Sequence, residues 1–136
     1  MSRKSAREYA YKLVFEYIFD RDAQTPTKDQ IFQDPNLTKI DADYINNVYE
    51  GIQAHFDEII ETISRNAKNF RIDRIFKPDL AALMLAIYEM QYIDDIPLNV
   101  SISEAVELVK EYSTDKSYQF VNGVLAGVYK ELNKLC

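Results

Sequence analysis

The sequence has very little cysteine, glycine, proline or histidine. Cys136 is the single cysteine among 136 residues, which excludes an internal disulfide and a cluster of cysteine ligands for a metal. Three glycines and four prolines are too few for a turn-rich β fold, so the composition favours helices. The one histidine, His55, has no second histidine or cysteine with which to share a metal ion, and we expect it to be structural.

Long apolar runs are missing as well. No stretch of the sequence is long enough to span a membrane. The segment from Arg3 to Tyr17 is amphipathic and continues into charged residues, unlike a signal peptide. We therefore expect a cytoplasmic protein. Apolar material is nevertheless ample, because 47% of the residues are hydrophobic, enough for one domain or for two small subdomains that share a core.

Catalytic motifs are also absent from the sequence. A Ser/His/Asp triad would have to use His55, which lies in a strongly periodic helical segment, and no G-x-S-x-G motif accompanies it. The glycines do not form a phosphate-binding loop, since all three lie in helical patterns. The many carboxylates are typical of solvated helix faces. We predict that the protein is not an enzyme and needs no cofactor or metal.

The charges are unevenly distributed along the chain. The net charge is −6, yet residues 1–12 carry four basic side chains and a single acidic one, Glu8. The basic residues are Arg3, Lys4, Arg7 and Lys12. This asymmetry suggests a basic helix that meets an acidic body.

Apolar residues at helical spacing predict a first helix from about Arg3 to Phe19. Its other side carries a row of cations and aromatics, namely Arg3, Arg7, Tyr11 and Phe15 at i, i+4 spacing, with Lys4 and Lys12 beside it. Such a face suits single-stranded RNA, because cations neutralise phosphates and each stacked base contributes about 1–3 kcal/mol. Spacing alone equally allows the aromatics to be core residues. We expect Arg7→Ala to weaken RNA binding without loss of helix.

Three features are predicted for the middle of the chain. A short helix from about Thr27 ends by Asp34, because a residue before proline is biased away from helix. Asp41 is the predicted N-cap of the longest helix, whose apolar period reaches Ile63. The basic cluster of residues 65–77 either pairs with the acidic face of that helix, which we favour, or contacts RNA. The helix that opens at Pro78 is apolar on most sides and therefore central.

The most distinctive stretch is residues 96–125. Ser101 and Glu104 form a capping-box pattern, and Ser113-Thr114-Asp115 is a second helix-start signal. Residues 120–125 read Phe-Val-Asn-Gly-Val-Leu, a helix in which glycine costs about 1 kcal/mol relative to alanine. Our interpretation is that Gly123 lets another helix approach closely and that Asn122 forms hydrogen bonds in the core.

This stretch resembles the NusB family of transcription antitermination factors. The family has Ile/Val-Pro, then Asn/Ser-Glu-Ala-Val/Ile-Glu-Leu, then Phe-Val-Asn-Gly-Val-Leu; residues 96–97, 103–108 and 120–125 are similar. Ser103 replaces the more usual asparagine, and Met84 stands where the family commonly has arginine. The helix around residues 83–90 and the basic opening are also similar to the family, so the resemblance spans essentially the whole chain.

The resemblance implies an all-α fold of six to seven helices, arranged as two small helical bundles packed across each other. Residues 1–136 would form a single NusB-like RNA-binding domain, with subdomains of about 1–66 and 67–136. Such a protein would bind single-stranded boxA RNA of ribosomal RNA leader transcripts together with the ribosomal protein NusE. The complex would join the RNA polymerase elongation complex and suppress termination. Some family members are dimers, so a homodimer stays open.

The resemblance also indicates which residues bind. Candidate RNA contacts are Arg3, Lys4, Arg7 and Lys12 for phosphates, Phe15 and Phe120 for bases, and Ser117 and Tyr118 for hydrogen bonds. Asp79 corresponds to an acidic position on the surface that the family uses for its protein partner, although it is equally a favourable charge at a helix N-terminus. An acidic body suits a basic ribosomal protein.

Two other functions fit parts of the sequence. Certain ribosomal RNA cytosine methyltransferases begin with a related RNA-binding domain, but they need a long C-terminal domain with a nucleotide-binding glycine loop, and this sequence ends at Cys136. A helical protein–protein adaptor without RNA binding is the other alternative. A partner interaction insensitive to salt, with no RNA binding, would identify it.

Overall fold

The computed structural model describes residues 2–20 and 27–134. Within those residues the chain forms seven α-helices and one short 3-10 helix, which confirms the all-α prediction. They are α1 (Arg3–Phe19), α2 (Thr27–Phe32), α3 (Lys39–Ala54), α4 (Phe56–Asn66), η1 (Ile72–Arg74), α5 (Lys77–Tyr92), α6 (Leu98–Tyr112) and α7 (Ser117–Lys134). No helix in this part of the chain is long and apolar enough to cross a membrane.

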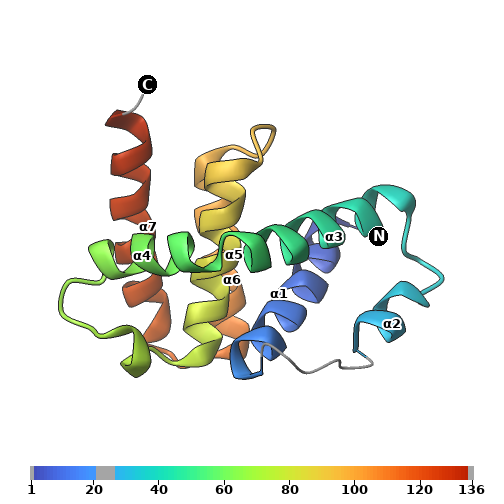
Figure 1. The fold of residues 1–136 in the computed structure, drawn as a ribbon, viewed down its shortest axis with the longest axis horizontal. Helices are drawn as coiled ribbons and strands as arrows, with labels where there is room; N and C mark the ends of the chain where they lie inside the picture. The colour runs from blue at the N-terminus through green and yellow to red at the C-terminus, as the bar shows by residue number, and fades with distance from the viewer. Residues whose placement is uncertain (1, 21–26, 135–136) are drawn as a thin grey trace.

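The central element is α5, as its sequence predicted. It contacts α1, α3, α4, α6 and α7, and every residue from Asp79 to Met90 is buried. A helix that is apolar on most sides must be covered on most sides. In Figure 1, α3 and α4 follow one another across the molecule, with α1 and α2 at one end and α7 at the other.

The predicted longest helix is two helices in the structure. α3 ends at Ala54 and α4 begins at Phe56, with His55 between them at φ −110° and ψ 20°. Because the break is a single residue, the apolar period continues across it, which is why the sequence predicted one helix. The His55 ring stacks on Tyr92 with 4.3 Å between ring centroids, which gives this histidine a structural contact.

Two predicted helix starts are wrong. Thr38 is the N-cap of α3, and Asp41 is the third residue of a capping box with it. α6 begins at Leu98, so the predicted cap Ser101 lies inside the helix. The Ser101 hydroxyl instead donates a 2.9 Å hydrogen bond to the buried carboxylate of Glu89. The Ser101 hydroxyl therefore bonds to Glu89 on another helix instead of capping its own helix.

Close helix approaches occur at Gly51 and Gly127 rather than at Gly123. A Cβ on Gly51 would lie 2.2–2.3 Å from three atoms of the Tyr88 ring and hydroxyl, and one on Gly127 would lie 2.2 Å from Asn66 Oδ1. A Cβ on Gly123 would meet nothing within 4 Å, and Asn122 is exposed. The interpretation that residues 122 and 123 serve the core is therefore wrong.

Candidate nucleic-acid interface

Arg7 belongs to a buried polar network rather than to an exposed cationic face. Its side chain is only about 5% exposed, and its Nε and Nη2 donate hydrogen bonds of 2.8 and 3.1 Å to Glu89. Tyr44 and Ser101 donate to the same carboxylate. Helices α1, α3 and α6 thus each supply a donor to one acceptor on α5, which ties four helices together.

The electrostatics of this network keep Arg7 charged and Tyr44 protonated. Burial lowers the pKa of Arg7, but the hydrogen bond and charge of Glu89 outweigh burial and hold that pKa above its ordinary value. Burial raises the pKa of Tyr44, so its hydroxyl stays protonated and donates to Glu89. The Arg7 guanidinium is therefore already paired inside the protein, and its predicted phosphate contact stays a prediction.

The other three predicted cations of α1 remain exposed. The Arg3 guanidinium lies 4.4 Å from the Tyr44 ring centroid, and Lys12 Nζ lies 5.9 Å from the Tyr112 centroid. Phe15 is partly exposed and packs edge-on against Phe19. Arg3, Lys4 and Lys12 therefore keep their cations accessible to phosphates.

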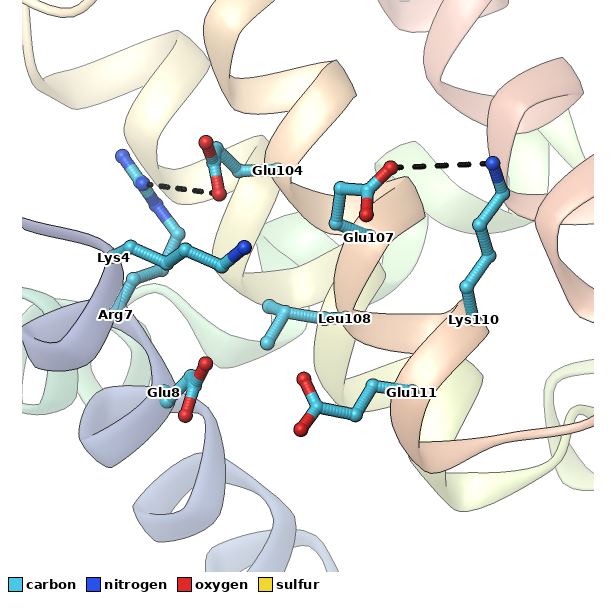
Figure 2. Close-up of a pocket in the computed structure, with 8 residues that line it drawn as sticks. All are labelled: Lys4, Arg7, Glu8, Glu104, Glu107, Leu108, Lys110 and Glu111. Carbon is cyan, nitrogen blue, oxygen red and sulfur yellow. Dashed lines mark ion pairs between the residues drawn. The ribbon is translucent and has the colours of Figure 1, made fainter.

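The groove between α1 and α6 is more acidic than the sequence suggested. It is lined by Lys4, Arg7 and Glu8 of α1 and by Glu104, Glu107, Leu108, Lys110 and Glu111 of α6. In Figure 2 the Lys4 side chain extends into the gap between the two helices, and the carboxylates of Glu8 and Glu111 face each other. Four carboxylates disfavour a phosphate deep inside the groove, while the Lys4 side chain itself is exposed.

A second surface lies where the connector of residues 67–76 meets α5 and α7. It is a groove of about 350 Å³ bordered by Phe70, Arg74, Phe76, Lys116 and Phe120. Phe70 and Phe120 meet edge-on with 4.8 Å between centroids, and Phe70 and Phe76 are more than half exposed. Such a cluster of exposed aromatic rings marks an interaction surface.

Asp79 and Ser117 lie at the floor of this groove rather than on its surface. Asp79 accepts hydrogen bonds of 2.6 Å from Ser113 and 2.9 Å from Ser117, and both Asp79 and Ser117 are buried. Both side chains line the groove and are already hydrogen-bonded there, so their predicted contacts with a partner or with RNA stay predictions. Tyr118, in contrast, is exposed, and Lys110 Nζ lies 5.2 Å from its ring centroid.

The basic cluster of residues 65–77 makes ion pairs different from those expected. Arg65 pairs with Glu131 of α7 at 3.2 Å, and Arg71 pairs with Asp73 inside the connector at 3.3 Å. Lys77 Nζ lies 5.4 Å from the centroid of Phe19. For Arg71 the favoured interpretation of pairing with the acidic face of the long helix is wrong. Arg65 also has Glu61 of that face nearby, since its pKa is raised by the hydrogen bond and charge of Glu131 and then by the charge of Glu61.

A sequence model of the NusB family matches residues 4–130. The chain belongs to the NusB family. The NusB antitermination protein of Natranaerobius thermophilus is 42% identical over 98% of this chain and 99% of its own length. That of Acetivibrio thermocellus is 41% identical over 96% of this chain and 90% of its own length.

Solved NusB structures share the fold. The T. maritima NusB structure superposes with a TM-score of 0.87 at 31% identity, covering 96% of this chain and 92% of the other. A structure described as antitermination factors NusB and NusE in complex with dsRNA gives 0.82 at 26% identity, covering 95% of this chain and 96% of the other. The NusB resemblance and the arrangement of helical bundles are thereby confirmed.

Proposed function

We propose that this protein is a transcription antitermination factor that binds single-stranded boxA-type RNA of ribosomal RNA leader transcripts together with the ribosomal protein NusE. The complex joins the elongating RNA polymerase in the cytoplasm and suppresses termination. The observation that carries the proposal is the match to NusB relatives over nearly the full length of the chain. The protein acts by binding, without a catalytic step.

Phosphates of the RNA are held by the exposed cations of α1, namely Arg3, Lys4 and Lys12. Phe15 lies on the same helix and offers a partly exposed ring for stacking. Arg7 supports this site from inside, because its bonds to Glu89 hold α1 against α5. Tyr118 and Phe120 provide further contacts at the start of α7.

NusE docks on the connector side of the groove between the connector and α7, at Phe70 and Phe76, beside the Phe120 ring that contacts RNA. Exposed aromatic rings around a groove are typical of protein interfaces, and the acidic net charge of −6 complements a basic ribosomal protein. Asp79 acts here as a positioning residue. Through Ser113 and Ser117 it holds the junction of α6 and α7, and it therefore sets the place of Phe120 in the groove.

Titrating a boxA-like single-stranded RNA at several salt concentrations, with and without NusE, tests the function. For single strands, log K falls against log salt with a slope of about −0.7 per phosphate neutralised. The double variant Lys4→Gln/Lys12→Gln is expected to weaken binding and to flatten the slope by about 1.4. Its circular dichroism should stay unchanged, because both side chains are exposed.

The matched control is Lys39→Gln/Lys130→Gln, which removes the same charge from exposed positions in α3 and in α7. This pair should leave the binding slope close to that of the unmodified protein. Equal weakening by both pairs would show that net charge, and not the face of α1, governs binding. Absence of RNA binding under every condition would contradict the function and favour the protein-only adaptor.

A further inference from the structure

A mostly apolar pocket lies between α1, the first turn of α5 and the end of α6. Its volume is about 330 Å³, and it is lined by Tyr11, Lys12, Phe15, Glu16, Thr27, Pro78 and Tyr112. That volume is at the lower end of the range for small-molecule sites. Tyr112 is about a hundred positions from the α1 residues along the chain, so local spacing does not reveal this pocket.

The walls of the pocket are aromatic and held in place. Tyr11 is buried, and its hydroxyl donates a 3.0 Å hydrogen bond to the carbonyl of Pro78. The Tyr11 and Tyr112 rings meet with 5.5 Å between centroids and a tilt of 38°. Tyr112 is 37% exposed, so part of its ring stays open to a ligand. A preformed wall loses little entropy when a ligand binds.

Cations flank the aromatic walls, and an acceptor lies among the lining residues. Lys12 Nζ is 5.9 Å from the Tyr112 ring centroid. Lys77 Nζ is 5.4 Å from the centroid of Phe19, which itself packs on Phe15. The carboxylate of Glu16 accepts a 2.7 Å hydrogen bond from Thr27. Of these two lysines, Lys12 is the one that lines the pocket, and flat apolar rings beside a cation match the chemistry of a base beside a phosphate.

We propose that this pocket holds one unpaired base of a single-stranded RNA, stacked on Tyr112 and Phe15, with a neighbouring phosphate at Lys12. The inference rests on the proposed RNA-binding function and adds a defined base subsite to it. Aromatic stacking accepts any base.

An abasic scan of a boxA-like RNA, combined with the variant Tyr112→Leu, tests the subsite. Loss of one stacked base should weaken binding about 5- to 150-fold, the range that corresponds to stacking on an aromatic side chain. The critical position is the one at which removal of the base weakens binding most. Removing that base should have little further effect on the Tyr112→Leu variant, since both changes delete the same contact. The salt slope should stay unchanged, because neither change removes a charge.

Tyr129→Leu is the matched control, because Tyr129 lies on α7 and is 39% exposed, close to the 37% of Tyr112. It should bind RNA normally. Phe15→Leu gives a second probe of the pocket, and 2-aminopurine at the critical position should lose its stacking-induced quenching in that variant.

Three outcomes would overturn the inference. In the first, RNA binds in a salt-dependent way, but every abasic position weakens binding equally in the unmodified protein and in Tyr112→Leu. That result would contradict the base subsite and leave the proposed function standing. In the second, the Tyr112→Leu variant binds NusE more weakly but binds RNA alone normally. That result would show that a protein side chain occupies the pocket. Absence of any RNA binding by the unmodified protein would overturn both the subsite and the function.

Discussion

Replacement of Glu89 by alanine is expected to lower the free energy of unfolding by about 3–5 kcal/mol, the usual effect of breaking a buried ion pair. The Glu89 side chain is fully buried and accepts hydrogen bonds from Arg7, Tyr44 and Ser101. Without it, the Arg7 guanidinium stays buried, with the carboxylate of Glu104 3.8 Å away. Urea unfolding measures the change as a lower midpoint at constant slope.

Glu107→Ala is the control for this prediction. Glu107 is exposed and lies 3.9 Å from Lys110, so its loss should change the stability by less than about 1 kcal/mol. The double variant Arg7→Ala/Glu89→Ala should lose less stability than the sum of the two single variants, because each single change leaves a partner unpaired. Equal effects of Glu89→Ala and Glu107→Ala would mean that the network does not stabilise the fold.

Because of this network, the Arg7→Ala variant does not test a direct contact between Arg7 and RNA. The sequence placed Arg7 on an exposed face, where its loss would weaken RNA binding and leave the fold intact. In the structure the same substitution leaves the Glu89 carboxylate buried without its cation. Weakened RNA binding by Arg7→Ala would therefore follow from a destabilised α1, and Lys4 and Lys12 are the better probes of the interface.

Gly51→Ala is expected to destabilise the protein by about 1–3 kcal/mol, the usual effect of overpacking. Its Cβ would lie 2.2–2.3 Å from the hydroxyl and two ring carbons of Tyr88. The Tyr88 ring is buried, and its hydroxyl donates to Asn47 of α3, so the ring cannot move without losing a contact. The loss exceeds the helix-propensity gain of about 1 kcal/mol that alanine brings. Thermal or urea unfolding checks it.

Gly123→Ala is the matched control, since it makes the same change in a helix where the new Cβ meets nothing within 4 Å. It should stabilise the protein by about 1 kcal/mol through helix propensity alone. Stabilisation by both substitutions would show that α3 and α5 separate easily, contrary to the packing at Gly51. A measurement of RNA binding by the Gly123→Ala variant would also show whether position 123 contacts RNA.

Much of the fold was predictable from local patterns. The bounds of α1 and the central position of α5 both follow from apolar spacing. These predictions succeed because burial of a helix face depends on its own sequence. The start of α6 was predicted wrongly because the same Ser-x-x-Glu pattern serves either a cap or a tertiary hydrogen bond.

The candidate site was predictable only in part. The basic character of α1 was evident from the sequence. Nothing in the sequence near its four cations shows, however, that one of them, Arg7, is buried. The signal that distinguishes Arg7 is Glu89, a carboxylate within a helix whose other residues from Leu80 to Met90 are almost all apolar. A buried carboxylate needs a cation, yet nothing local says which of several cations supplies it.

The sequence by itself determined that the protein is helical, that α5 is central, and that the chain resembles NusB proteins. Only the tertiary structure decided that Arg7 pairs with Glu89, 82 positions away, and that Tyr11 and Tyr112 form one pocket. It also decided which glycine lies against another helix. The physical reason is that helical periodicity specifies which face of each helix is buried, whereas contacts between particular side chains depend on how distant helices pack against each other.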